Sequence, residues 1–219
     1  TAFGAHDGLP ANAAFFIADD GHGSLWVAGL RGVYRMPLAS LLKRIEVPAT
    51  PLQAELLLNE RGQRHGGVQG LCCNGAGNGK GFIDNGTLWL PSRDGVVSMD
   101  TAGIVKNPVA PLPVVERIRA QGRWMAPQAL RDAPLPAQAR DLDFEFTAAS
   151  FQAPENVELR YRLLGYDTQW RTLDDIRQRV ATYTNLPGGD YVFEVTGSNN
   201  AGVWAPAPAR LPLRIRLRF

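Results

Sequence analysis

The stretch Asp20-Gly21-His22-Gly23-Ser24-Leu25-Trp26-Val27 decides how the first half of this sequence is interpreted, because the stretch recurs. The second copy, Asp84-Asn85-Gly86-Thr87-Leu88-Trp89-Leu90, follows at an offset of 63 residues, and the Leu-Trp pairs of the two copies coincide. The same offset, without a gap, also aligns the residues that come after each copy: Gly32-Val33 with Gly95-Val96, and Met36 with Met99. An ungapped match of this kind indicates an internal structural repeat.

Each copy is typical of a turn, a strand, a second turn with glycine and another short strand, which predicts antiparallel hairpins. Blades of a β-propeller are four-stranded units of about 40 to 50 residues. The longer offset therefore predicts an insertion within residues 37–67, with a brief helix at 37–45. Two copies cannot close a propeller, which needs about four blades or more. We expect residues 1–110 to be terminal propeller blades, with further blades upstream or with edges protected in another way.

The sequence changes character at a proline-marked connector, residues 107–113. Beyond it, apolar and polar residues alternate with a period of two, as on strands with one buried face. The clearest stretches are 142–146, 159–163, 191–195 and 213–219, and shorter strands are expected at 114–118, around Trp124 and at 180–183. About seven short strands in about 105 residues are typical of an immunoglobulin- or fibronectin-like β-sandwich. Residues 111–219 are predicted to form this sandwich, and the fold class is all-β.

The composition is that of ordinary globular domains, with 45% hydrophobic and 20% charged residues among 219. The net charge of +2 comes from 23 basic and 21 acidic side chains that are spread along the sequence, which argues against binding to nucleic acid or an anionic surface. No apolar run approaches the roughly 20 residues that a bilayer-spanning helix needs. The sequence starts at Thr1 without a signal-like segment, so we expect a piece of a longer protein.

The two cysteines, Cys72 and Cys73, are adjacent. Neighbouring α-carbons lie about 3.8 Å apart, which is closer than the usual range for a disulfide. A strained vicinal disulfide and a pair of packed or idle thiols both remain open. The cysteines therefore do not define the redox compartment.

Residues that could carry chemistry have simpler explanations. The glycine-rich run 74–81 lacks the residues and the strand-to-helix context of a phosphate loop, so we expect a loop between strands. The histidines have no second ligand at metal spacing: His6, His22 and His65. One strand face carries acids that alternation explains as its solvent side: Asp141, Asp143 and Glu145. We expect a non-enzymatic chain without metal or cofactor.

The aromatic residues are interpreted as core. Tyr161, Tyr183 and Tyr191 occupy strand positions where a ring fills the sandwich and its hydroxyl finds a partner at the edge. Trp26 and Trp89 are interpreted as blade core rather than as a platform for sugars. Asn85-Gly86-Thr87 matches a glycosylation sequon but is explained better as a hairpin turn. Loops at the propeller face would hold any ligand, and the candidates are Arg31, Arg93 and Asp94.

The first half resembles the propeller repeats of bacterial two-component regulators. The residues that carry this resemblance are Asp7-Gly8-Leu9-Pro10-Ala11-Asn12, Ile17-Ala18-Asp19-Asp20, Leu25-Trp26-Val27-Ala28-Gly29 and Gly32-Val33-Tyr34-Arg35. The second half is similar to the "three Y" domain that follows such propellers. Its residues are Leu159-Arg160-Tyr161-Arg162-Leu163-Leu164-Gly165-Tyr166-Asp167 with Trp170, then Ala181 to Phe193, and Ser198 to Trp204.

This resemblance implies a function in signal reception and relay. In such proteins the propeller lies outside the inner membrane, a transmembrane helix follows the tyrosine-rich domain, and the output is a histidine kinase or a diguanylate cyclase. We therefore expect a periplasmic sensor region that works as a homodimer through the sandwich, with a carbohydrate or other small ligand on the full propeller. The alternative is a secreted carbohydrate-binding or adhesion module, and an enzyme is the weakest interpretation.

Overall fold

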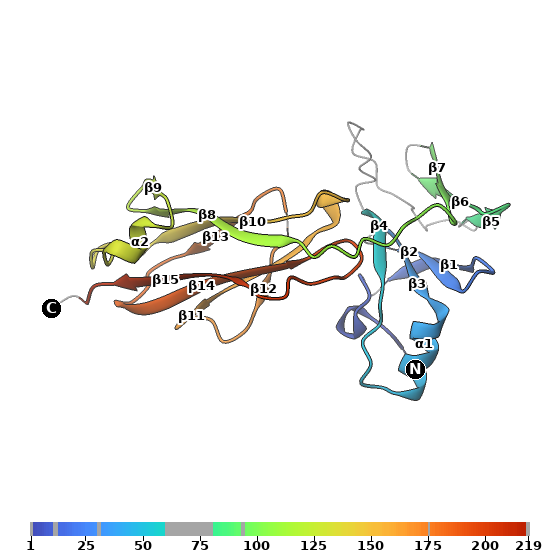
Figure 1. The fold of residues 1–219 in the computed structure, drawn as a ribbon, viewed down its shortest axis with the longest axis horizontal. Helices are drawn as coiled ribbons and strands as arrows, with labels where there is room; N and C mark the ends of the chain where they lie inside the picture. The colour runs from blue at the N-terminus through green and yellow to red at the C-terminus, as the bar shows by residue number, and fades with distance from the viewer. Residues whose placement is uncertain are drawn as a thin grey trace. The chain divides into compact units, whose positions relative to one another are not determined.

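Two compact units make up the chain. The computed structural model describes residues 2–10, 13–29, 32–59, 81–92, 95–174 and 176–217. The N-terminal unit comprises Thr1–Pro108 with Asn200–Gly202, and the C-terminal unit comprises Val109–Asn199 and Val203–Phe219. Both units are built mainly from antiparallel sheets (Figure 1), which confirms the all-β prediction. The division after Pro108 falls within the proline-marked connector.

The first copy of the repeat lies in a four-stranded antiparallel sheet. Its strands follow chain order: β1 (Ala14–Asp19), β2 (Ser24–Gly29), β3 (Gly32–Pro37) and β4 (Glu55–Asn59). A 3₁₀ turn, η1 (Ala5–Asp7), precedes the sheet. Helix α1 (Leu38–Glu46) follows β3, which confirms the helix predicted at 37–45.

The carboxylate of Asp20 holds the turn between β1 and β2. It accepts hydrogen bonds from the backbone N–H groups of His22 (2.8 Å) and Ser24 (3.0 Å), and from the indole Nε1 of Trp26 (3.0 Å). Burial alone would raise the pKa of the Asp20 carboxyl, but these donors outweigh burial and hold the pKa below its ordinary value. The acidic-glycine turn of the repeat thus also fixes the indole of Trp26.

The second copy forms a three-stranded antiparallel sheet in the described part of the chain. Its strands are β5 (Phe82–Asp84), β6 (Thr87–Ser92) and β7 (Gly95–Asp100). Asn85 and Gly86 connect β5 to β6 with φ angles of 45° and 75°. Two consecutive positive φ values are typical of tight hairpin turns, which confirms the interpretation of Asn85-Gly86 as a turn.

One hydrophobic cluster joins the two sheets. Its buried members are Trp26, Ala28, Val33, Leu58, Leu88 and Leu90. Trp26 is fully buried as predicted, but Trp89 at the same repeat position is 38% exposed, so the prediction of a core residue is wrong for Trp89. Leu88 and Leu90 face the first sheet, so strand alternation turns Trp89 to the other face, where the described residues cover it only in part.

The C-terminal unit is a β-sandwich of two four-stranded antiparallel sheets. One sheet has the order β13 (Val180–Tyr183), β10 (Leu142–Ala149), β8 (Leu112–Ala120) and β9 (Arg123–Met125). The other has the order β12 (Arg171–Thr172), β11 (Glu158–Leu164), β14 (Gly189–Ser198) and β15 (Ala209–Ile215). Short helices α2 (Ala129–Asp132) and η2 (Pro154–Asn156) lie in the connections. No helix in the described ranges is long and apolar enough to cross a bilayer.

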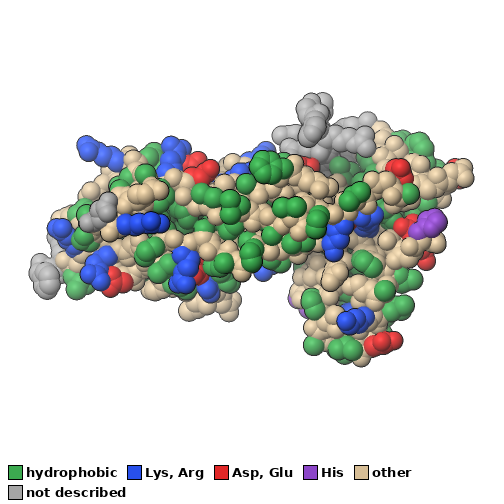
Figure 2. Space-filling view, in the orientation of Figure 1, with side chains coloured by type: hydrophobic (Ala, Val, Ile, Leu, Met, Phe, Trp, Pro, Cys, Tyr) green, Lys and Arg blue, Asp and Glu red, His purple; other side chains and the backbone are tan. Residues whose placement is uncertain are grey.

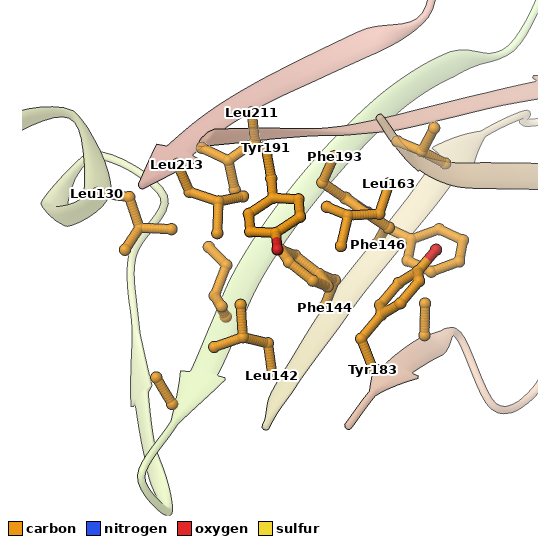
Figure 3. Close-up of a cluster of buried hydrophobic side chains, with 14 of the residues drawn as sticks. Leu130, Leu142, Phe144, Phe146, Leu163, Tyr183, Tyr191, Phe193, Leu211 and Leu213 are labelled. Atoms are coloured by element: carbon orange, nitrogen blue, oxygen red, sulfur yellow. The ribbon is translucent and has the colours of Figure 1, made fainter. Parts of the chain in front are cut away.

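The sandwich core lies between the two sheets (Figure 3). The rings of Phe144 and Phe193, from opposite sheets, stack with centroids 4.1 Å apart. The inward positions are those that alternation predicted along β10, β11 and β14. The predicted pattern is wrong for Leu217, which is 61% exposed, because β15 ends at Ile215, opposite the first residue of β14. Phe219 lies outside the described residues.

Candidate functional site

The loop residues suggested for ligand binding, Arg31, Arg93 and Asp94, lie outside the described residues. The same holds for Cys72, Cys73, His65 and residues 74–80 of the glycine-rich run. Among the residues that are described, no group of His, Cys, Asp or Glu is arranged to hold a metal ion. The polar features of interest are therefore a pocket in the N-terminal unit and a network in the sandwich.

A small pocket lies beside β3 and β4. Its volume is about 200 Å³, and its polar lining includes Ser24, Arg35, Gln53, Glu55 and Lys106. Arg35 donates from Nε to Glu55 Oε2 (2.9 Å) and from Nη2 to the carbonyl of Ile104 (2.9 Å). The second carboxylate oxygen, Oε1, has no partner but is itself buried. The guanidinium of Arg35 is therefore already paired within the protein, and Lys106 is the exposed basic side chain of the lining.

A network centred on Asp167 lies where β11 turns towards β12. The turn begins at Gly165, whose φ is +91° and whose added Cβ would lie 2.8 Å from the carbonyl oxygen of Asp190. Glycine is the residue that adopts this backbone without strain. The turn brings Asp167 back to the strand end, so that its Oδ2 accepts the backbone N–H of Leu163 (2.8 Å).

Asp167 also connects the two sheets of the sandwich. Tyr183, the last residue of β13 in the opposite sheet, donates its hydroxyl to Asp167 Oδ2 (2.5 Å). Arg171, the first residue of β12, donates to Oδ1 from Nε (2.9 Å) and Nη2 (2.5 Å). The same guanidinium lies 5.3 Å from the centroid of the Tyr183 ring. One carboxylate thus links three segments, with charge-assisted hydrogen bonds that are among the stronger ones in proteins.

The electrostatics of this network are those of a structural site. Burial, followed by the hydrogen bond to Asp167, raises the pKa of the Tyr183 hydroxyl well above its ordinary value. The hydroxyl therefore stays protonated and remains a donor at neutral pH. A phenol that keeps its proton and a carboxylate that is already engaged by three groups are poorly suited to general acid–base work. The network is suited instead to holding the two sheets together.

The other tyrosines pack around this network. Tyr191 is 6% exposed and donates its hydroxyl to the carbonyl of Pro187 (2.8 Å), and the Tyr161 ring meets that of Tyr183 at 90° with centroids 6.5 Å apart. The prediction of core tyrosines is confirmed for Tyr183 and Tyr191, while Tyr161 packs on the core from a half-buried position. Sequence reasoning missed Asp167, whose one signal was its place directly after Gly165-Tyr166.

The outward face of the β10 sheet carries paired rather than free acids. Asp143 is 8% exposed and accepts a hydrogen bond from Arg119 Nε (2.6 Å), and Glu145 pairs with Arg117. The indole of Trp124 covers both guanidinium groups, with centroid distances of 4.3 Å to Arg117 and 5.4 Å to Arg119. The alternation placed these acids on the correct face, but it could not show that arginines neutralise them.

The outward face of the β14 sheet also carries an acid that is paired with arginines. Glu194 lies between two arginines of neighbouring strands, with 2.6 Å to Arg162 Nε and 3.1 Å to Arg210 Nε. The ring of Trp170 covers the Arg162 guanidinium at 4.3 Å. The pairing of β11 and β15 with β14 places Arg162 and Arg210 directly opposite Glu194. These contacts stabilise the sandwich.

Comparison with known families gives a match in the C-terminal part of the sandwich. Residues 150–216 match the model of the Y_Y_Y domain. The matched range contains Tyr161, Tyr183 and Tyr191 and the whole Asp167 network. The three-Y resemblance is therefore confirmed over this range.

Similar proteins extend the comparison to the whole chain. A histidine kinase of Formosa agariphila is 23% identical over 222 positions, which cover 96% of this chain and 15% of that protein. Mycosin-4 of Mycobacterium tuberculosis is 32% identical over 123 positions, which cover 48% of this chain and 26% of that protein. The extracellular domain of a hybrid two-component system of B. thetaiotaomicron has a TM-score of 0.55 and 18% identity, and covers 98% of this chain and 33% of that one. This last likeness shows a shared fold. The chain spans a third or less of each of these proteins.

Proposed function

We propose that this chain belongs to the extracytoplasmic sensor and signal-relay region of a bacterial membrane-bound signalling protein. The observation that carries the proposal is a Y_Y_Y match at 150–216 within a chain that shares its fold, over 98% of its length, with an extracellular domain of a two-component system. In this proposal the region is periplasmic, a transmembrane helix follows the sandwich, and the output domain is a histidine kinase or a diguanylate cyclase. The chain itself is then non-enzymatic.

In this proposal the N-terminal unit is the end of a β-propeller. Phe82 and Trp89 are direct partners on β5 and β6, so they share one face of the second sheet. That face is exposed at Phe82 (59%) and Trp89 (38%), whereas Leu88 and Leu90 on the opposite face are buried. A sheet with two apolar faces, one of them uncovered, fits a blade that packs between two neighbours. A further blade would cover Trp89 as the second sheet covers Trp26.

The sandwich is the proposed relay. The Tyr183–Asp167 bond and the stacked Phe144 and Phe193 rings tie its two sheets into one body. A body of this kind moves as a whole when one end is displaced. Ligand binding to the full propeller, by a carbohydrate or another small molecule, would shift the pose of two sandwiches in a homodimer. Such a relay requires two discrete states with different ligand affinity.

The topology of the whole protein tests the proposal directly. Alkaline phosphatase fused after Phe219 should be active, because the enzyme folds only outside the cytoplasm, and a fusion beyond the next apolar segment should be inactive. Full-length protein should also stay with the membrane fraction after a high-salt wash. A protein that is released into the medium, with no membrane segment after Phe219, would instead support the secreted binding or adhesion module.

The dimer requires its own experiment. The extracytoplasmic region with all its blades should sediment as a dimer in analytical ultracentrifugation, and a variant with altered charges on one outer sandwich face should sediment as a monomer. R117Q/R119Q and R162Q/R210Q alter opposite outer faces and serve as controls for each other. Circular dichroism must show that each variant is folded, because these arginines pair with acids of the sandwich. If the unaltered region is monomeric with and without added ligand, the dimer relay is wrong.

A further inference from the structure

Three exposed arginines at one end of the sandwich have no hydrogen-bond or ion-pair partner for their side chains among the described residues. They are Arg123, Arg131 and Arg216. Arg123 opens β9 and pairs with Ala120 at the end of β8, and Arg131 lies on α2. Arg216 follows β15 and donates its backbone N–H to Leu135, in the segment after α2 (2.9 Å). Figure 2 shows basic side chains at this end, together with some acidic ones, and the C-terminus lies at the same end in Figure 1.

Other charges at this end are already satisfied. Arg214 pairs with Asp190, and Arg140 donates from Nε to the carbonyl of Leu186 (3.0 Å). Asp141, which precedes β10, accepts the backbone N–H of Asn185 (2.8 Å). In total, residues 121–141, 184–190 and 214–217 contain five arginines and three aspartates. The end of the sandwich therefore carries excess positive charge. The even spread of charge along the sequence hid this feature, because the fold brings together arginines from distant segments.

We infer that this end of the sandwich lies against the anionic headgroups of a lipid bilayer. Lipid phosphates complement planar guanidinium groups in charge and geometry. The last strand, β15, ends here, so under the proposed function, on which this inference rests, a following membrane helix leaves the domain from this face. Tyr166, in the turn after β11, is 49% exposed, and Leu217 is 61% exposed. Tyrosine and arginine are residue types that suit the membrane–water interface.

Vesicle co-sedimentation of the 219-residue chain tests the inference. The chain should bind vesicles of phosphatidylglycerol mixed with phosphatidylcholine, and it should bind pure phosphatidylcholine far less. Each arginine near an anionic surface contributes about fivefold to partitioning, so R123Q/R131Q/R216Q should weaken binding by about a hundredfold. High salt should release the unaltered chain, because exposed charges are screened. Circular dichroism would verify that the variant is folded.

A matched variant distinguishes the arginine cluster from net charge. K43Q/K80Q/K106Q removes the same number of positive charges from the N-terminal unit, and it should retain most of the binding. Equal loss in both variants would overturn the inference, as would equal binding to both kinds of vesicle. Stronger binding to soluble polyglutamate than to vesicles would indicate an acidic protein partner instead and would also overturn it. Vesicle binding needs no membrane helix, so the fusion experiment can fail while this inference stands.

Discussion

The hydroxyl of Tyr183, at the end of β13, donates a hydrogen bond of 2.5 Å to Asp167, in the turn after β11 of the opposite sheet. Most contacts between the two sheets are apolar and non-directional, whereas this hydrogen bond is directional. Because Asp167 is also bound by Arg171 and by the backbone of Leu163, the bond fixes the position of the β11 turn relative to β13. The relative position of the two sheets is therefore fixed at this end of the sandwich.

Removal of the Tyr183 hydroxyl should destabilise the sandwich. Tyr183→Phe keeps the ring packing but leaves Asp167 without one donor, and we expect the free energy of unfolding to fall by about 1 to 3 kcal/mol. Urea unfolding followed by circular dichroism measures the change. Tyr166→Phe removes a hydroxyl from a half-exposed ring and should change the free energy by less than about 0.5 kcal/mol. Similar losses in both variants would contradict a specific role for the Tyr183–Asp167 bond.

Alkaline pH should destabilise the sandwich through the same hydroxyl. The pKa of Tyr183 is raised in the folded state by burial and by the bond to Asp167. Above about pH 10 the unfolded chain releases this proton while the folded chain keeps it, so the unfolded state is favoured as pH rises. The contribution is fully present below about pH 10 and falls by up to about 1.4 kcal/mol per pH unit above it.

Urea unfolding at a series of alkaline pH values checks this expectation. Tyr183→Phe should show a shallower decline of stability with pH than the unaltered chain. The pKa of Tyr191 is also raised, chiefly by burial, so the variant should retain part of the decline. Parallel pH profiles for the two proteins would show that Tyr183 titrates as in the unfolded chain.

Two glycines with positive φ allow backbone strain to be separated from steric contact. Gly122 has a φ of +76° with nothing within 4 Å of an added Cβ, so Gly122→Ala should cost about 1 to 2 kcal/mol from strain alone. Gly165→Ala adds a Cβ that would lie 2.8 Å from a backbone oxygen, so its cost should clearly exceed that of Gly122→Ala. Urea unfolding of both variants provides the comparison. A smaller cost at Gly165 would mean that the β11 turn can shift.

Trp26 and Trp89 should respond differently to truncation. Trp26→Ala removes a fully buried indole and should cost about 3 to 5 kcal/mol, whereas Trp89→Ala removes a partly exposed one and should cost far less. Thermal unfolding of the 219-residue chain, followed by circular dichroism, measures both. In a longer protein with further blades, Trp89→Ala should become nearly as costly as Trp26→Ala. An unchanged, small cost there would contradict the proposal that another blade covers Trp89.

More of the fold than of the candidate site could be predicted from the sequence. The 63-residue repeat predicted antiparallel hairpins, and strand alternation predicted the inward faces of the sandwich, because both signals are local. The exposure of Trp89 depends on whether a neighbouring sheet is present, which no local pattern reports. Similarly, the pairing of Asp167 with Tyr183 joins residues on different sheets, and the clustering of Arg123 with Arg216 depends on chain topology.

The directions of β8 and β15 have a mechanical consequence. β8 enters the sandwich at Leu112, far from the end where β15 finishes at Ile215, and both strands run towards that end. A force applied between these two points acts along the strands, while the hydrogen bonds of antiparallel sheets lie across them. Every bond of the β8–β10 and β14–β15 ladders then shares the load, so the ladders cannot open one bond at a time. We expect the sandwich to resist stretching along this axis and to behave as a stiff rod in single-molecule pulling.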